Sequence, residues 1–218
     1  MIEARAGSRN DTPLEILSRW HAEAPLGLLT LDAPLGWPEV FSRQLASHRA
    51  GESIPAGPGE FFRRETDCDI HRRFAKMPLE VGANFIARTA LAALRLLGDL
   101  RDRTGEMIPL AWGASPPERF SAIEVYPAAT LRGAGMSVFP YKKKGDAGNR
   151  EVMLAEFPKW LAISPPVLAA ACRDADVLDA ILCVVAGVDY CEGRAVGPPA
   201  EWEDVARIEG WIWAAPAG

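Results

Sequence analysis

The stretch LLTLD at residues 28–32 indicates the fold class of this chain. Its apolar residues do not alternate strictly with polar ones, which is typical of a strand covered on both faces in an α/β sheet. Asp32 follows at the carboxyl end of this strand, where ligands bind in such sheets. A second stretch, AIEVY at residues 122–126, carries Glu124 inside another apolar run. The sequence therefore predicts an α/β protein with a site near the strand ends.

Composition limits the class of protein further. The chain has 218 residues, 49% of them hydrophobic, and a net charge of −5, so we expect a single domain over residues 1–218. The negative charge argues against a globally basic nucleic-acid binder but leaves room for a local basic groove. No secretory signal and no run of about 20 apolar residues is recognised. The four cysteines have no zinc-binding spacing, and we expect a cytoplasmic protein without a membrane partner.

The order of helical and strand patterns along the chain supports the same class. TPLE at residues 12–15 has the pattern of a capping box at a helix start, and Asp174 can cap another helix. Residues 33–78 are rich in Pro, Gly and Arg and are expected to form an irregular insertion. Further helices are expected at about 78–105, 149–161 and 166–172, and further strands at 107–112, 120–126 and 209–213.

Four acids lie in elements that are otherwise apolar, and a buried carboxylate without a partner is costly. A divalent cation removes this cost, and Mg²⁺ prefers oxygen ligands. Two-metal phosphoryl chemistry needs several converging carboxylates. The sequence therefore predicts a Mg²⁺ or Mn²⁺ site with Asp32, Glu124 and Asp179 as catalytic residues, and these three together with Asp176 as metal ligands.

Each of these acids also has a structural interpretation. Asp176 lies near a helix start, where a carboxylate serves the cap and the helix dipole. Asp32 precedes Ala33-Pro34 and can be a turn former. Glu124 can pair with an arginine in the core.

Charged residues elsewhere are candidates for substrate binding. Lys142 and Lys143, followed by Arg150, can contact phosphates, and the alternative is a solvated loop. Arg64 and Asp67 can form a substrate clamp or a structural ion pair.

Six short segments, in this order, resemble domain-of-unknown-function family 429, whose members are predicted to be ribonuclease-H-like nucleases. The segments are TLDAPLG at 30–36, RETD at 64–67, IEVYP at 123–127, YKKK at 141–144, DVLDA at 176–180 and EGWI at 209–212. The pair Asp176 and Asp179 is also similar to the acid pair on the last helix of RuvC-like resolvases.

The resemblance implies a ribonuclease-H-like mixed sheet flanked by helices, two-metal catalysis and a nucleic-acid substrate. Members of that superfamily carry an Asp on the first strand, and this chain shows none, so its N-terminal strands are expected to be partly missing. An exposed sheet edge then favours a homodimer.

Three functional hypotheses follow. The first is a metal-dependent nuclease, a hydrolase of phosphodiester bonds. The second is a non-catalytic protein of the same fold that binds nucleic acid or a protein partner, which the missing Asp favours. The third is a metal-dependent hydrolase of a small phosphorylated substrate.

Overall fold

The computed structural model describes residues 4–24, 26–82 and 84–217. Its sheet consists of two parallel strands, β1 (Leu28–Leu31) and β2 (Ser121–Glu124), whose register pairs Leu28 with Ser121 and Leu31 with Glu124. Leu110 and Ile212 each form a single parallel bridge to β2. The strands expected at 107–112 and 209–213 are therefore reduced to isolated bridges, and the strand expected at 120–126 is shorter than predicted.

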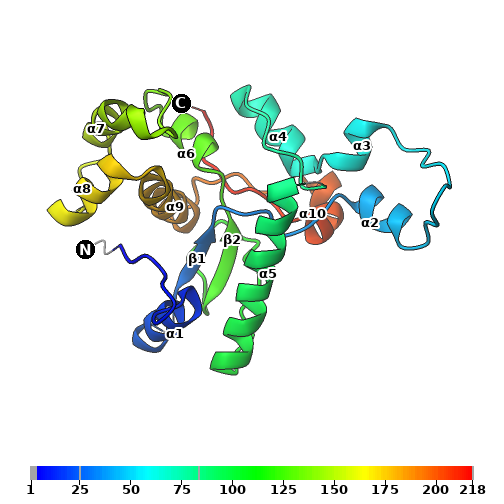
Figure 1. Cartoon of the computed structure of the whole chain (residues 1–218), viewed down its shortest axis with the longest axis horizontal. Helices are drawn as coiled ribbons and strands as arrows, with labels where there is room; N and C mark the ends of the chain where they lie inside the picture. The colour runs from blue at the N-terminus through cyan, green and yellow to red at the C-terminus, as the bar shows by residue number, and fades with distance from the viewer. Residues whose placement is uncertain (1–3, 25, 83, 218) are drawn as a thin grey trace.

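Helices form most of the rest of the described chain (Figure 1). They are α1 (Pro13–Glu23), α2 (Glu39–Leu45), α3 (Pro58–Phe62), α4 (Glu65–Phe74), α5 (Asn84–Thr104), α6 (Pro127–Gly133), α7 (Ala147–Ala155), α8 (Pro165–Arg173), α9 (Ala175–Cys191) and α10 (Glu203–Glu209), with short 3₁₀ turns η1 (Lys144–Asp146) and η2 (Ala200–Trp202). This mixture of helices with a small parallel sheet confirms the α/β class. Within the described residues, no helix is long and apolar enough to cross a membrane.

The two strands lie between helices, as the apolar sequence of β1 predicts. Leu28 and Ile123 pack against α9 on one face. Leu29 and Ala122 pack against α5 and α1 on the other face. Figure 1 shows α9 and α5 on opposite sides of the strand pair. The carboxyl ends of β1 and β2 point toward α4 and α6, so side chains from several elements meet there.

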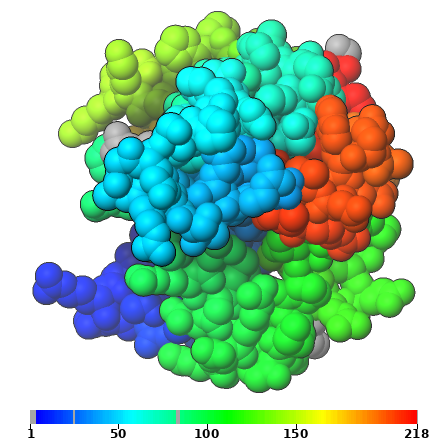
Figure 2. All heavy atoms as spheres, turned by 90° about the vertical axis from the view of Figure 1, so that its right-hand side faces the viewer, coloured from blue at the N-terminus to red at the C-terminus, as the bar shows by residue number. Residues whose placement is uncertain are grey.

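The segment at 33–78 was expected to be irregular, but it contains α2, α3 and α4. Helix α4 was not predicted from the sequence. Three residues of its buried face, Thr66, Asp67 and Asp69, are polar, and the apolar periodicity that indicates a helix is therefore weak. Figure 2 shows the part of this segment that carries α2 and α3, in cyan, beside α5 in green and α10 in orange.

Two helix starts follow the sequence closely. Thr12 and Glu15 form the predicted capping box of α1, with the Thr12 side chain accepting from the Glu15 backbone. Asp174 caps α9 by accepting from the backbone N–H of Asp176 at 2.9 Å. The caps fix where α9 begins and therefore where Asp179, one turn into this helix, is placed.

Candidate functional site

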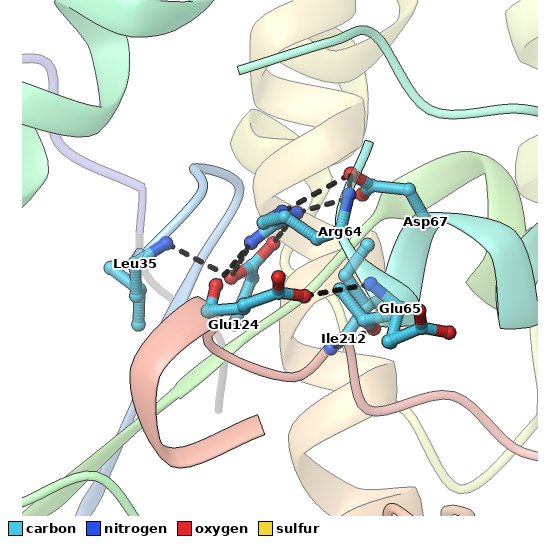
Figure 3. A network of polar contacts seen from close by, with 8 residues as sticks. Leu35, Arg64, Glu65, Asp67, Glu124 and Ile212 are labelled. Atoms are coloured by element: carbon cyan, nitrogen blue, oxygen red, sulfur yellow. Dashed lines mark hydrogen bonds and ion pairs between the residues drawn. The ribbon is translucent and has the colours of Figure 1, made fainter. Parts of the chain in front are cut away.

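Arg64, the residue before α4, is the centre of a buried network of charged groups (Figure 3). Its guanidinium donates to both carboxylate oxygens of Glu124, at 2.7 and 2.9 Å. It also donates to both oxygens of Asp67, at 2.8 and 3.2 Å. Burial acts to lower the pKa of Arg64, but the charges of Glu124 and Asp67 outweigh this effect and raise it. Arg64 and Asp67 thus form a structural ion pair rather than an exposed clamp.

The carboxylate of Glu124 has further structural contacts. Its Oε2 also accepts from the backbone N–H of Leu35 at 2.9 Å, which ties the turn after β1 to β2. Gly210, at a φ of +82°, lies so close that a Cβ added there would stand 2.9 Å from this oxygen. Both oxygens of Glu124 are therefore already hydrogen-bonded within the protein.

Glu209, at the end of α10, extends this network to two helix starts. Its carboxylate accepts from the backbone N–H of Glu39 at 2.8 Å and from that of Glu65 at 2.7 Å. Its own carbonyl accepts from Arg64 at 3.0 Å. Because a carboxylate at a helix start satisfies unpaired N–H groups and complements the dipole, Glu209 holds α2 and α4 against α10.

The second acid cluster lies between the carboxyl end of β1 and α9. Asp179 is 5% exposed. It accepts from the Tyr141 hydroxyl at 2.8 Å and also from the Lys142 ammonium. Asp32, at the carboxyl end of β1, is near enough for the charges of Asp179, Lys142 and Glu124 to act on it.

Strand geometry explains why the predicted acids form two clusters. Successive residues of a strand point to opposite faces. Ile123 and Val125 pack against α9, so Glu124 between them points to the other face, where it meets Arg64. Leu31 packs with the α5 cluster, so Asp32 after it lies on the α9 side. The four predicted metal ligands are therefore not brought together as one group.

The environment of Asp32 favours its protonated form. The pKa of Asp32 is raised to about 6, first by burial and then by the negative charge of Asp179, while Lys142 acts in the opposite direction. Much of the Asp32 surface is accessible to solvent. The residue lines a concave cleft, however, and the surrounding protein replaces part of the water around its carboxylate. Burial also raises the pKa of Tyr141, and the charge of Asp179 acts in the same direction.

A cleft of about 450 Å³ opens above the strand ends. Its lining includes Asp32 and Lys142, the buried pair Arg64 and Glu124, and a wall from residues 76–79 and α5. Tyr126, the residue before α6, also lines it. A volume in this range suits a small organic ligand.

Arg150 is placed differently from the prediction. It is 1% exposed, and its guanidinium donates to the main-chain carbonyls of Tyr141, Lys143, Cys172 and Arg173. These four hydrogen bonds hold the 141–143 loop on α8, which is a structural role for Arg150.

Asp176 and Lys143 are both exposed. Asp176 contributes a small charge effect at Asp32, so it lies at the periphery of the cluster. The backbone of Lys143 donates to Asp146 at 3.0 Å, and Lys143 does not line the cleft. Of the five predicted substrate-binding residues, Lys142 alone combines an exposed charge with a place in this cleft.

Within residues 4–24, 26–82 and 84–217, no three Asp, Glu, His or Cys side chains are grouped so that they could hold a metal ion by themselves. The carboxylates of Asp32 and Asp179 remain as a pair. Mg²⁺ is often held by one or two carboxylates, with water and substrate phosphate completing its shell. A single ion held in this way needs fewer protein carboxylates than the two-ion centre expected from the sequence.

Sequence reasoning did not assign a site role to Tyr141, Lys76 or Glu209. Tyr141 orients Asp179 through its hydroxyl, and its place directly before Lys142 was the available signal. Lys76 reaches the cleft from the C-terminal end of α4, which no local pattern indicates. Glu209 lay in a segment expected to be a strand.

Together these features define an α/β protein with a carboxylate-bearing cleft at the carboxyl ends of two parallel strands. The chain belongs to the DUF429 family, described as a protein of unknown function, whose model matches residues 8–204. This confirms the family resemblance carried by the sequence motifs. Neither the curated proteins nor the solved structures gave a match to this chain.

Proposed function

We propose that this protein is a metal-dependent nuclease that hydrolyses phosphodiester bonds in the cleft at the end of β1. The observation that carries the proposal is the pair Asp32 and Asp179. The two carboxylates lie close enough for one to raise the pKa of the other, and Asp32 opens into a cleft lined by lysine side chains. Like charges placed together are stabilised by a cation.

In this proposal Asp32 and Asp179 hold a single Mg²⁺ or Mn²⁺. Such an ion, when bound, neutralises phosphate charge and lowers the pKa of a water molecule. Tyr141 fixes the orientation of Asp179 by its hydrogen bond to Oδ1. Glu124, by contrast, keeps the strand ends in register through Arg64 and Leu35, which is a positioning role.

The lysines of the cleft supply positive charge for the phosphate. Lys142 contacts Asp179 and keeps 59% of its side chain exposed, so its ammonium can turn to a substrate. Lys76 lines the same cleft and is exposed.

The ribonuclease-H-like fold is part of the same proposal. It is supported by the parallel strand pair, by Asp32 at a strand end and by Asp179 on the long helix α9 that covers the strands. Nucleic acid as the substrate rests on the resemblance to the predicted nucleases. Among the described residues β1 pairs with β2 alone, and its unpaired edge supports pairing of two copies there.

A non-catalytic protein that binds nucleic acid or another partner is the second candidate. One observation favours it: Lys142 already neutralises Asp179, and Glu124 is committed to Arg64. A cleft with these contacts can bind an anion without an ion of its own. The hydrolysis of a small phosphorylated molecule is a variant of the first proposal with a smaller substrate.

The test is cleavage of a labelled single-stranded oligonucleotide in Mn²⁺. We expect cleavage by the unmodified chain, loss of about 100-fold or more in Asp179→Asn because a charged ligand is removed, and a smaller loss in the peripheral Asp176→Asn. Circular dichroism shows whether each variant folds. Unchanged cleavage in Asp179→Asn, or cleavage that persists with a chelator, contradicts the proposal. Binding without cleavage supports the second candidate.

A further inference from the structure

The lining of the cleft is of two chemical kinds. Its charged groups are Asp32, Glu124, Arg64, Lys76 and Lys142. Its apolar wall includes Met77, Leu79 and Ile86. Leu79 is 69% exposed, so this apolar surface faces open space at the mouth of the cleft.

Such a wall is not needed to bind a phosphate. Large apolar side chains exposed beside a polar site are typical of a surface that contacts an apolar part of a ligand. The ligand that fits this cleft therefore has a charged part and a flat or bulky apolar part. Its size is limited by the cleft volume of about 450 Å³.

Charge sets a second limit on the ligand. The chain has a net charge of −5. The cations that line the cleft are Lys76, Lys142 and Arg64, and Arg64 is already paired with Asp67 and Glu124. Binding of a long duplex through its phosphates needs many cationic contacts. Two lysines match one phosphate group, so affinity has to come from the part of the ligand next to that phosphate.

We propose that the cleft recognises one nucleotide unit, with its phosphate near Lys76 and Lys142 and its base against the wall of Met77, Leu79 and Ile86. This inference rests on the proposed function for the reaction at the phosphate, and adds the base as the main source of affinity. In a duplex the base faces are stacked, whereas in a single strand or a free nucleotide they are accessible. The unit is therefore a free nucleotide or an unpaired nucleotide of a strand.

The experiment compares the binding of adenosine 5′-monophosphate and ribose 5-phosphate to the intact chain by calorimetry in Mn²⁺. We expect the nucleotide to bind about tenfold more tightly, because the base buries apolar surface. Leu79→Ala should weaken nucleotide binding about fivefold by the same argument and leave ribose 5-phosphate unchanged. Leu91→Ala is the matched control, because Leu91 is also exposed, at 45%, and lies on α5 outside the cleft lining.

Equal affinity for the two ligands, or equal effects of Leu79→Ala and Leu91→Ala, overturns the inference. Tighter binding of a duplex than of a single strand of the same sequence also overturns it. Tight binding of a single strand identifies an unpaired nucleotide of a chain as the source, and binding of the free nucleotide alone identifies the smaller ligand. The readout is binding, so absence of cleavage removes the proposed function while the base preference is still measured.

Discussion

Two acid clusters flank the ends of the same two strands, and they differ in how their charges are satisfied. Glu124 and Asp67 are nearly fully buried and share the guanidinium of Arg64. Asp32 and Asp179 are held beside a lysine that is more than half exposed, and Asp32 opens into the cleft. Arg64 and Glu124 also line the cleft, but their charged groups are paired with each other by internal hydrogen bonds, whereas the second cluster keeps a charged group open to a ligand.

This difference distinguishes carboxylates with a structural role from candidate functional carboxylates, which residue type alone does not. Perturbed carboxylates occur in both structural ion pairs and functional sites. Here the two kinds of carboxylate differ in whether their oxygens are still available to bind a ligand. The oxygens of Glu124 already accept from Arg64 and Leu35, while Asp32 has a raised pKa and access to a cleft.

The largest effect should come from opening the closed cluster. Arg64→Ala leaves Asp67 and Glu124 buried without their cation, which is expected to cost about 3–5 kcal/mol in the free energy of unfolding. Denaturant unfolding measures this loss. The adjacent Arg63→Ala is the control, because Arg63 and Glu80 form an exposed pair of the kind that contributes about 0–1 kcal/mol. Similar losses in the two variants would remove the distinction between the clusters.

A smaller effect is expected from the open cluster, and it depends on pH. The pKa of Asp32 is raised from 3.8 to about 6, so between these values the folded chain binds more protons than the unfolded chain. Its stability should therefore decrease as pH rises through this range. Asp32→Asn cannot titrate, so with chelator present its free energy of unfolding should rise relative to the unmodified chain between about pH 4 and pH 6.

Thermal or denaturant unfolding at several pH values checks this difference. The comparison between variant and unmodified chain cancels the other groups that titrate in the same range. A difference that stays constant with pH would mean that Asp32 is not held near Asp179 and away from water.

The sequence predicted the α/β class, the caps of α1 and α9, and a β1 strand covered on both faces. These features depend on local patterns that the residues carry themselves. It did not predict α4, because Asp67 and Asp69 lie on its buried face. Their burial depends on Arg64 and Arg73, which is a tertiary effect.

Prediction of the candidate site from the sequence was limited in the same way, by effects that depend on tertiary structure. Asp32 was predicted to lie at the end of a strand, and Asp179 near the start of a helix. In the structure the charge of Asp179 acts on Asp32, so the two belong to one cluster. Glu124 lines the same cleft as Asp32 and its charge acts on Asp32, but the register of β1 and β2 points its side chain toward Arg64. Register is set by packing between distant segments, so sequence alone left open whether Glu124 binds an ion or pairs with an arginine.

The central claim is that Asp32 and Asp179 form the functional centre, and calorimetric titration with Mn²⁺ tests it most directly. The account predicts one bound ion in the unmodified chain, loss of binding in Asp179→Asn, and binding retained with reduced affinity in Asp176→Asn. Equal binding in the unmodified chain and Asp179→Asn, or no binding in either, would contradict it.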